Sequence, residues 1–170
     1  MSDPTLAARQ ATLVAALVAG GPVPPGFEEW RVRAADRALR QKRAGEVANA
    51  WPRLATGLGA DWSDRFCRWA RGRPPKGALA DGWDLARELA FLGQLPALAR
   101  TELAVREVTC RYDGRGRPSR RRGLALRRVP GGVAVGLFGR VRIFGGSCWG
   151  RRQCGRRRGG GTSARPVPHA

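Results

Sequence analysis

The chain of 170 residues is long enough for one domain with an appended segment, and its 32 Lys and Arg against 13 Asp and Glu give a formal net charge of +19. The hydrophobic fraction of 42% suffices for a modest core, and the 24 Gly and 12 Pro fall short of what a wholly disordered protein shows. No apolar run approaches the roughly 20 residues of a membrane span, and the first residues lack the basic start of a signal peptide, so we expect a cytoplasmic protein.

The acidic residues are unevenly distributed along the chain. Twelve of the 13 lie before residue 113, whereas arginine and glycine dominate the remainder, which has one acid. Five of the six Trp residues also lie in the first part. This change in composition predicts four segments. They are a helical bundle domain (1–112), a basic linker (113–123), a small β-segment (124–144) and a disordered basic tail (145–170).

Apolar residues at helical spacing predict that the first domain is mainly α. Asp3 and Pro4 are typical of a helix N-cap and a first helical residue, and Gly20 is typical of a helix end. A second helix is expected to begin near Phe27. Pro52 should interrupt it, because proline lacks the backbone N–H that a helix interior needs.

Three more helices are expected before residue 112. Asp61 and Asp81 are predicted N-caps, Pro96 begins the last helix, and Leu98 and Val108 belong to its apolar stripe. An aromatic face at i, i+4 and i+7 is interpreted as core packing in preference to a ligand site: Trp62, Phe66 and Trp69. The predicted fold class is therefore mainly α, an orthogonal five- or six-helix bundle followed by a short β-meander and a disordered Arg/Gly tail.

Alternating apolar residues on both sides of 130–132 (Pro-Gly-Gly) predict a β-hairpin, and a third alternating run follows. We expect the apolar side chains of these strands to form one row on one side of a three-stranded meander. An extended peptide can add a strand to an open sheet edge, so the candidate peptide-binding edge consists of Val133, Val135, Val141 and Ile143. The alternative is that the meander only packs on the helices and its edge is covered.

The residue types that enzymes use are sparse. The one histidine is His169, and five residues separate Cys148 from Cys154, unlike the spacing of a zinc knuckle. Cys67 and Cys110 fall on expected helices and are interpreted as small buried apolar residues. We therefore expect no catalytic residues, no bound metal and no cofactor.

Arginine clusters in the last third of the chain suggest contacts with nucleic acid phosphates. The candidates are Arg120, Arg121, Arg122, Arg127, Arg128, Arg151, Arg152, Arg156, Arg157 and Arg158. The competing interpretation is a solvated tail, since these arginines lie in glycine-rich sequence. A near absence of lysine also fits a GC-rich coding bias, for which no binding function is needed.

Several sequence blocks resemble those of a small, uncharacterised actinobacterial helical family over residues 5–144. The blocks are 40–52, 62–69, 72–77, 81–84, 106–114 and 126–135. More distantly, the order of helices is similar to a helical domain, described as DNA-binding, in bacterial partner proteins. Those proteins accompany multinuclear non-haem iron-dependent oxidative enzymes that modify ribosomally made peptides.

The resemblance implies a non-enzymatic accessory protein, or adaptor, that has no metal of its own. Such a protein docks an iron-dependent oxidative enzyme through its helices and offers a small β-region to the precursor peptide. A nucleic-acid-binding protein that uses the C-terminal arginines is the alternative. Neither hypothesis requires a membrane.

Overall fold

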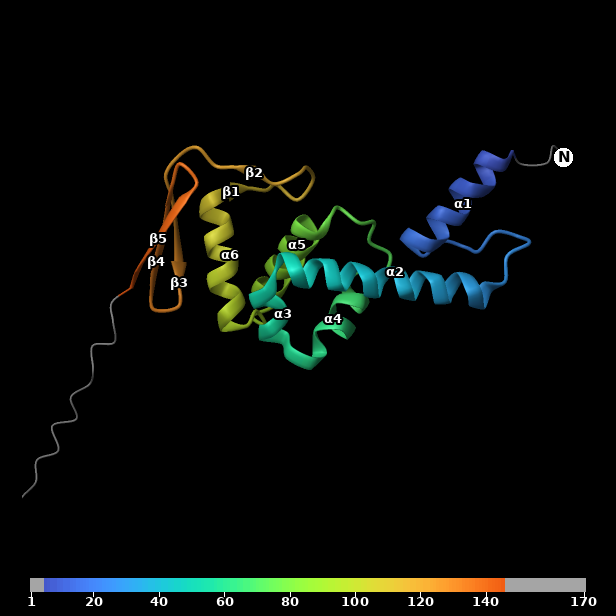
Figure 1. Ribbon diagram of the computed structural model, residues 1–170, viewed down its shortest axis with the longest axis horizontal. Helices are drawn as coiled ribbons and strands as arrows, with labels where there is room; N and C mark the ends of the chain where they lie inside the picture. The colour runs from blue at the N-terminus through green and yellow to red at the C-terminus, as the bar shows by residue number, and fades with distance from the viewer. Residues whose placement is uncertain (1–4, 146–170) are drawn as a thin grey trace, which may run out of the picture.

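A computed structural model describes residues 5–145 of the protein (Figure 1). Within this range the fold is mainly α, followed by two small antiparallel sheets. The helices are α1 (Leu6–Ala19), α2 (Glu29–Ala50), α3 (Pro52–Leu58), the 3₁₀ turn η1 (Gly59–Asp61), α4 (Trp62–Trp69), α5 (Ala78–Phe91) and α6 (Ala97–Thr109). The strands are β1 (Cys110–Arg111), β2 (Ser119–Arg120), β3 (Ala125–Val129), β4 (Gly132–Leu137) and β5 (Arg140–Gly145).

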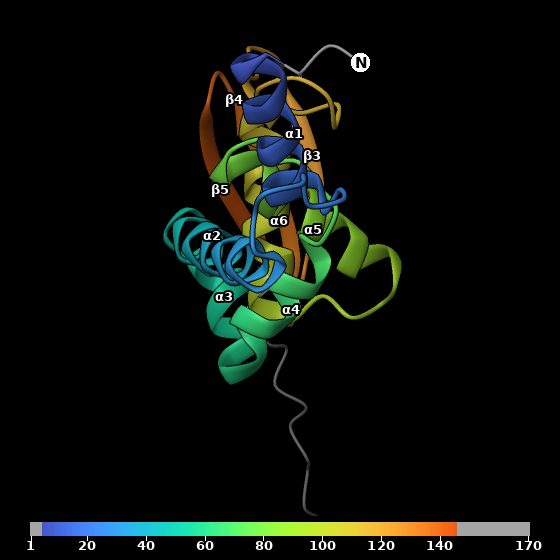
Figure 2. The same ribbon diagram turned by 90° about the vertical axis from the view of Figure 1, so that its right-hand side faces the viewer.

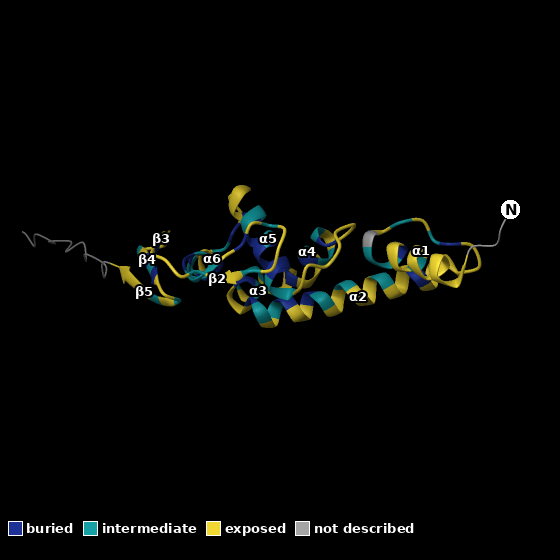
Figure 3. Ribbon diagram, turned by 90° about the horizontal axis from the view of Figure 1, so that it is seen from above, coloured by how far each residue is buried: buried dark blue, intermediate teal, exposed yellow. Residues whose placement is uncertain are grey.

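The elements are arranged along the molecule, with α1 at one end and the meander β3–β4–β5 at the other (Figure 1). Figure 1 shows α6 between the other helices and the meander, and Figure 2 gives the view from the α1 end. Colouring by burial shows that α5 is the most buried helix, whereas α1 is largely exposed and packs on α2 (Figure 3). The compact part of the helical region therefore consists of α2 to α6.

The first helix begins slightly later than the sequence suggested. Thr5 is the N-cap of α1, and its Oγ1 accepts a hydrogen bond from the backbone N–H of Ala8. Asp3 and Pro4 lie outside the described residues. Gly20 ends the helix in a left-handed conformation with φ of +71°, as predicted. Glycine adopts this conformation without steric cost.

Pro52 also has the predicted effect on the chain. It is the first residue of α3, where a missing N–H costs nothing, and α2 ends just before it at Ala50. The expected interruption is thus a direct change from one helix to the next at Trp51.

Asp61 occupies the predicted N-cap position of α4, whereas Asp81 lies inside α5 and is not its N-cap. The side chain of Asp61 makes no capping hydrogen bond, because Asp61 belongs to η1 and already has helical dihedral angles. Helix α5 begins three residues before Asp81 and follows Gly77, which has a φ of +99°. Asp81 is buried and accepts hydrogen bonds from Arg43 Nε (2.7 Å) and from the backbone N–H of Lys76 (3.1 Å). The carboxylate therefore ties α2 and the loop before α5 to the inside of the helical region.

The main core lies between α2 and α6 and is rich in aromatic side chains. Trp51 and Trp83 are fully buried and meet edge to face with 5.9 Å between ring centroids. Trp62 and Phe66 are also buried in this core, which confirms their predicted packing role. Trp69 is only half-buried, and its Nε1 donates a hydrogen bond to Glu88 (3.0 Å).

A second, smaller core joins the meander to α6. It is formed by small and medium apolar side chains: Ala104, Val108, Ala125, Val129 and Ala134. Gly136 lies directly against the backbone of Val108, where an added Cβ would overlap the carbonyl oxygen and lie 2.8 Å from the Val108 Cβ. The close approach of β4 to α6 therefore requires glycine at this position.

The pairing within the meander corrects the predicted apolar row. Val133 pairs with Phe144 and Val135 with Arg142, whereas Val141 pairs with Gly136 and Ile143 with Ala134. Directly paired residues share a face, so Val141 and Ile143 lie on the side that faces α6, opposite to Val133 and Val135. Two residues connect β4 to β5, and this turn length pairs odd-numbered positions of one strand with even-numbered positions of the other.

The predicted linker has secondary structure, and little of the predicted tail lies within the described residues. The predicted linker 113–123 contains β2, which pairs with β1 as a short antiparallel ribbon at the end of α6. The predicted tail begins at residue 145, which is the last residue of β5, and residues 146–170 lie outside the described part of the chain.

Candidate functional site

The meander has an apolar and basic outer face, which we define as the side chains of β3, β4 and β5 that point away from α6. The register assigns to it Leu126, Arg128, Val133, Val135, Leu137, Arg140, Arg142 and Phe144. Phe144 is 60% exposed, and Phe138, in the turn beside this face, is 75% exposed. Large apolar side chains are therefore presented to solvent next to three arginines. The last acid in the sequence is Asp113, so the three strands contain no carboxylate.

The candidate peptide-binding residues are not brought together at one edge. The strand order is β3–β4–β5, so Val133 and Val135 lie in the central strand and were wrongly placed at an edge. Val141 is half-buried against the small core on α6, and Ile143 is exposed on the same side. Within residues 5–145, the outer side of β5 has no strand beside it, so the backbone of β5 supplies the open edge.

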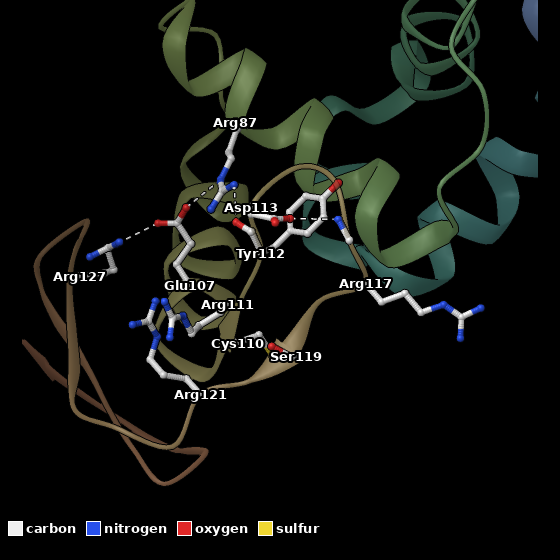
Figure 4. Close-up of a pocket in the computed structure, with 11 residues that line it drawn as sticks. Arg87, Glu107, Cys110, Arg111, Tyr112, Asp113, Arg117, Ser119, Arg121 and Arg127 are labelled. Carbon is white, nitrogen blue, oxygen red and sulfur yellow. Dashed lines mark hydrogen bonds and ion pairs between the residues drawn. The ribbon is translucent and has the colours of Figure 1, made fainter.

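A second candidate site is a cleft beside the β1–β2 ribbon (Figure 4). The cavity measures about 430 Å³ and lies between α5, the last turn of α6, the ribbon and β3. We call it the arginine cleft, and its lining side chains are Arg87, Glu107, Cys110, Arg111, Tyr112, Asp113, Arg117, Ser119, Arg121 and Arg127. Five arginines and two carboxylates therefore line the cleft.

One carboxylate organises two of these arginines. Glu107 accepts hydrogen bonds from Arg87 Nε (3.1 Å) and from Arg127 Nε (2.9 Å), as the dashed lines in Figure 4 indicate. The Nη1 atoms donate to backbone carbonyls, that of Arg87 to Tyr112 (3.0 Å) and that of Arg127 to Leu126 (3.0 Å). Both guanidinium groups are therefore held in fixed orientations.

Tyr112 forms the back of the cleft and remains protonated. Its hydroxyl donates a hydrogen bond to Asp84 Oδ2 (3.0 Å), and Lys76 Nζ donates to the same carboxylate oxygen (2.8 Å). Burial and the hydrogen bond to Asp84 raise the pKa of the Tyr112 phenol far above its usual value. The phenol is thus a neutral structural donor that fixes the start of the turn between β1 and β2.

The turn of the ribbon is fixed by two further interactions. Asp113 Oδ1 accepts hydrogen bonds from the backbone N–H groups of Gly116 (3.0 Å) and Arg115 (2.9 Å), which lower the pKa of the Asp113 carboxyl. Lys76 Nζ donates to the Gly114 carbonyl (2.7 Å). These bonds hold one wall of the cleft in position relative to α5.

The arginines singled out in the sequence are distributed over several surfaces. Arg121 and Arg127 line the cleft, whereas Arg128 lies on the outer face of the meander because it follows Arg127 in a strand. Arg120 and Arg122 are exposed beside the cleft. The remaining candidates lie outside the described residues: Arg151, Arg152, Arg156, Arg157 and Arg158.

Sequence reasoning missed Arg87, Arg111 and Arg117 as members of this site. Arg111 and Arg117 flank the Asp113 turn, and the basic residues around that turn were the available signal. Arg87 comes from α5 and reaches the cleft only through the packing of α5 beside the end of α6.

The described residues offer no evident metal site. Among them, no group of three or more His, Cys, Asp and Glu side chains could hold a metal ion. Cys67 and Cys110 are free thiols that are half-buried, so they are more accessible than predicted. No helix in the described range is long and apolar enough to cross a membrane.

A patch of apolar side chains is exposed where α5 ends. We call Phe91 and Leu92, at the end of α5, the Phe91 patch, and Phe91 is 90% exposed. Leu98 was expected in the buried stripe of α6, but it is 53% exposed because Ala99, Leu103 and Val108 supply that stripe.

Comparison with known proteins identifies the family. Residues 7–91, which are half of the chain and span α1, apart from its first residue, to α5, match the family described as SCO6045-like, C-terminal domain. The chain belongs to this family. A UPF0276 protein from Streptomyces avermitilis is 37% identical over 125 residues, which are 73% of this chain and 26% of that protein. The chain thus spans about a quarter of the length of this curated relative. No solved structure matches the chain.

Proposed function

We propose that the protein is a non-enzymatic adaptor that holds an extended precursor peptide on its meander while its helices contact a larger enzyme. The observation that carries this proposal is the outer face beside the open edge of β5. An added peptide strand would satisfy the free backbone groups of β5. Alternate side chains of that peptide would meet Leu137, Phe138 and Phe144, and acidic residues would suit Arg140 and Arg142.

The relationship to a much longer protein supports the adaptor role. In the Streptomyces avermitilis relative, the matching region is joined to roughly three quarters of additional chain. Two domains that are joined in one chain in one protein often associate as separate chains in another. The class of partner, an iron-dependent oxidative enzyme that modifies ribosomally made peptides, rests on the similar order of helices in known partner proteins of such enzymes, since no comparison names such an enzyme.

We assign the enzyme contact to the Phe91 patch. Large exposed aromatic side chains commonly anchor protein interfaces, and Phe91 is the most exposed large apolar residue described. The patch lies at the end of α5, at some distance along the chain from β5, so the two contacts can be tested separately.

The experiment uses the 170-residue chain, a co-expressed candidate iron enzyme, and fluorescent synthetic peptides tiled over a candidate precursor. Val141→Pro removes a donor from β5 and should weaken peptide binding while co-purification of the enzyme persists. Phe91→Asp should reduce co-purification of the enzyme while peptide binding persists. Arg142→Glu, on the outer face, should weaken binding of acidic peptides without disrupting the strand. Arg33→Glu, near the start of α2, is the matched control and should change neither interaction.

Two results would contradict the proposal. Unchanged peptide binding by Val141→Pro, with loss of β5 protection shown by hydrogen exchange, would exclude strand addition. If the unaltered chain binds neither the enzyme nor any of the peptides, the adaptor role is excluded.

Nucleic acid binding is the alternative, and the arginine cleft is the observation that favours it. Phosphate contacts release counterions, so binding of an oligonucleotide should weaken steeply as salt rises. The separation of Arg127 and Arg128 onto opposite faces of the meander disfavours one continuous basic surface. We therefore rank this function second.

A further inference from the structure

We propose that the arginine cleft is a binding site for the phosphate group of a small phosphate monoester. This inference is independent of the adaptor role, because the cleft lies on the α6 side of the meander and the peptide site is on the outer face. Three observations support it. They are the excess of positive charge in the cleft, the fixed orientation of two guanidinium groups, and the buried Nε of Arg121, which lacks an acceptor.

The charge in the cleft is not balanced by the protein. Glu107 is shared by Arg87 and Arg127, and Asp113 accepts two hydrogen bonds within its own turn. Throughout residues 5–145, Arg111, Arg117 and Arg121 form no ion pair with any carboxylate. The positive charge that remains suits a ligand with more than one negative charge.

The guanidinium groups of Arg87 and Arg127 are already oriented for such a ligand. Their Nε and Nη1 atoms are used by Glu107 and by backbone carbonyls, and no hydrogen bond within the described chain uses either Nη2. The Arg87 guanidinium also lies over the rings of Trp83 and Tyr112, at 5.5 and 5.7 Å from their centroids. Groups that are already held in place lose little conformational freedom when a ligand binds.

Arg121 supplies the buried donor. Its Nε is buried and has no hydrogen-bond partner among the described residues, which is uncommon for a buried polar atom. Its backbone N–H donates to the Thr109 carbonyl (2.7 Å), so the residue is anchored at the end of α6. An oxyanion in the cleft would provide the missing acceptor.

The shape of the site favours a terminal phosphate over a nucleic acid backbone. The cavity of about 430 Å³ is bounded by the ribbon, α5 and β3, which leaves room for one phosphate group with a small substituent. Arg117 points away from the other arginines in Figure 4, so we assign it to the rim. Guanidinium groups bind phosphate oxygens through paired hydrogen bonds, and a monoester offers three such oxygens and up to two charges.

The test measures binding to the full chain by calorimetry, with inorganic phosphate and phenyl phosphate as probes. Dimethyl phosphate, glutarate and a single-stranded oligonucleotide are the comparison ligands. We expect saturable binding of one phenyl phosphate per chain, with much weaker binding of the singly charged diester and of the dicarboxylate.

Substitutions identify the site. Arg111→Ala and Arg121→Ala should each weaken phenyl phosphate binding by about tenfold or more, since each removes a charge-assisted hydrogen bond. Arg121→Lys keeps the charge but loses the paired donors, so it should show an intermediate loss. Arg33→Ala removes an equally basic residue far along the chain and should leave binding unchanged. Arg111 is exposed, so its variant tests the site even if Arg121→Ala does not fold.

Three outcomes would overturn the proposal. One is the absence of saturable phosphate or monoester binding by the unaltered protein. Another is equal weakening by Arg33→Ala, which would indicate binding to net charge alone. Binding of the oligonucleotide through Arg111 and Arg121, without binding of either phosphate probe, would assign the cleft to nucleic acid instead.

Discussion

Gly82 has a role that depends on the absence of a side chain. It lies in α5 against the ring of Trp51, where an added Cβ would lie 2.7 Å from the Trp51 Cγ and closer still to two other ring atoms. Helix propensity alone would favour alanine at any helix interior. Packing should outweigh propensity here, because the Trp51 ring is fully buried and has little room to move.

We therefore predict opposite effects for the same substitution at two helical glycines. Gly82→Ala should lower the free energy of unfolding by about 1–3 kcal/mol through overpacking. Gly45→Ala in α2, where an added Cβ meets no atom within 4 Å, should raise it by about 0.5–1 kcal/mol. Urea unfolding of both variants measures this difference, and stabilisation by both would show that Trp51 can move aside.

Local sequence predicts the structural role of some residues and not of others. Gly20 and Pro52 act as expected because their effects depend on their own backbone chemistry. Asp81 was predicted as a cap because a carboxylate before an apolar run has that pattern. Its partner is Arg43, 38 residues earlier, and no local pattern indicates such a pair.

At the scale of elements, the attachment of the meander depends on contact between β4 and α6. Gly136→Ala should separate them, because its Cβ would overlap the backbone of Val108. We expect a loss of about 1–3 kcal/mol in stability and faster proteolysis within residues 125–145. Gly123→Ala, where an added Cβ is unobstructed, is the control and should cleave at the rate of the unaltered chain. Equal proteolysis of the two variants would show that the contact does not hold the meander.

The three strands of the meander were predictable from alternation and turn residues, but their faces were not. The faces depend on the number of residues between β4 and β5, which decides which positions pair. The β1–β2 ribbon was also missed, because strands of two residues have no alternating pattern. The arginine cleft depends on that ribbon and on Arg87 from α5, so the sequence indicated its basic character but not its composition.

At the scale of the whole molecule, α6 belongs to two cores. It contributes Ala99 and Leu103 to the main core, and Ala104 and Val108 to the small core beneath the meander. The small core consists of alanines and valines, so it buries much less apolar surface than the aromatic main core. We infer that the meander can open while the helices remain folded.

Hydrogen–deuterium exchange of two variants tests this division. Val108→Ala should speed exchange of amides in β3, β4 and β5 while those of α5 keep their protection. Leu103→Ala should lower the free energy of global unfolding by about 2–5 kcal/mol and speed exchange in α5 as well. A uniform increase across the molecule in Val108→Ala would indicate a single cooperative unit.

The register of the meander has an evolutionary consequence. A strand alternates its faces with a period of two, so a one-residue insertion between Gly132 and Val133 would turn Val133 and Val135 toward α6. Val135 would then occupy the position beside Val108 that only glycine fits. Descendants of this chain can therefore change the length of β4 by two residues, or lengthen its turns, far more readily than by one. Relatives that differ by a single residue within β4 should therefore carry a compensating β-bulge.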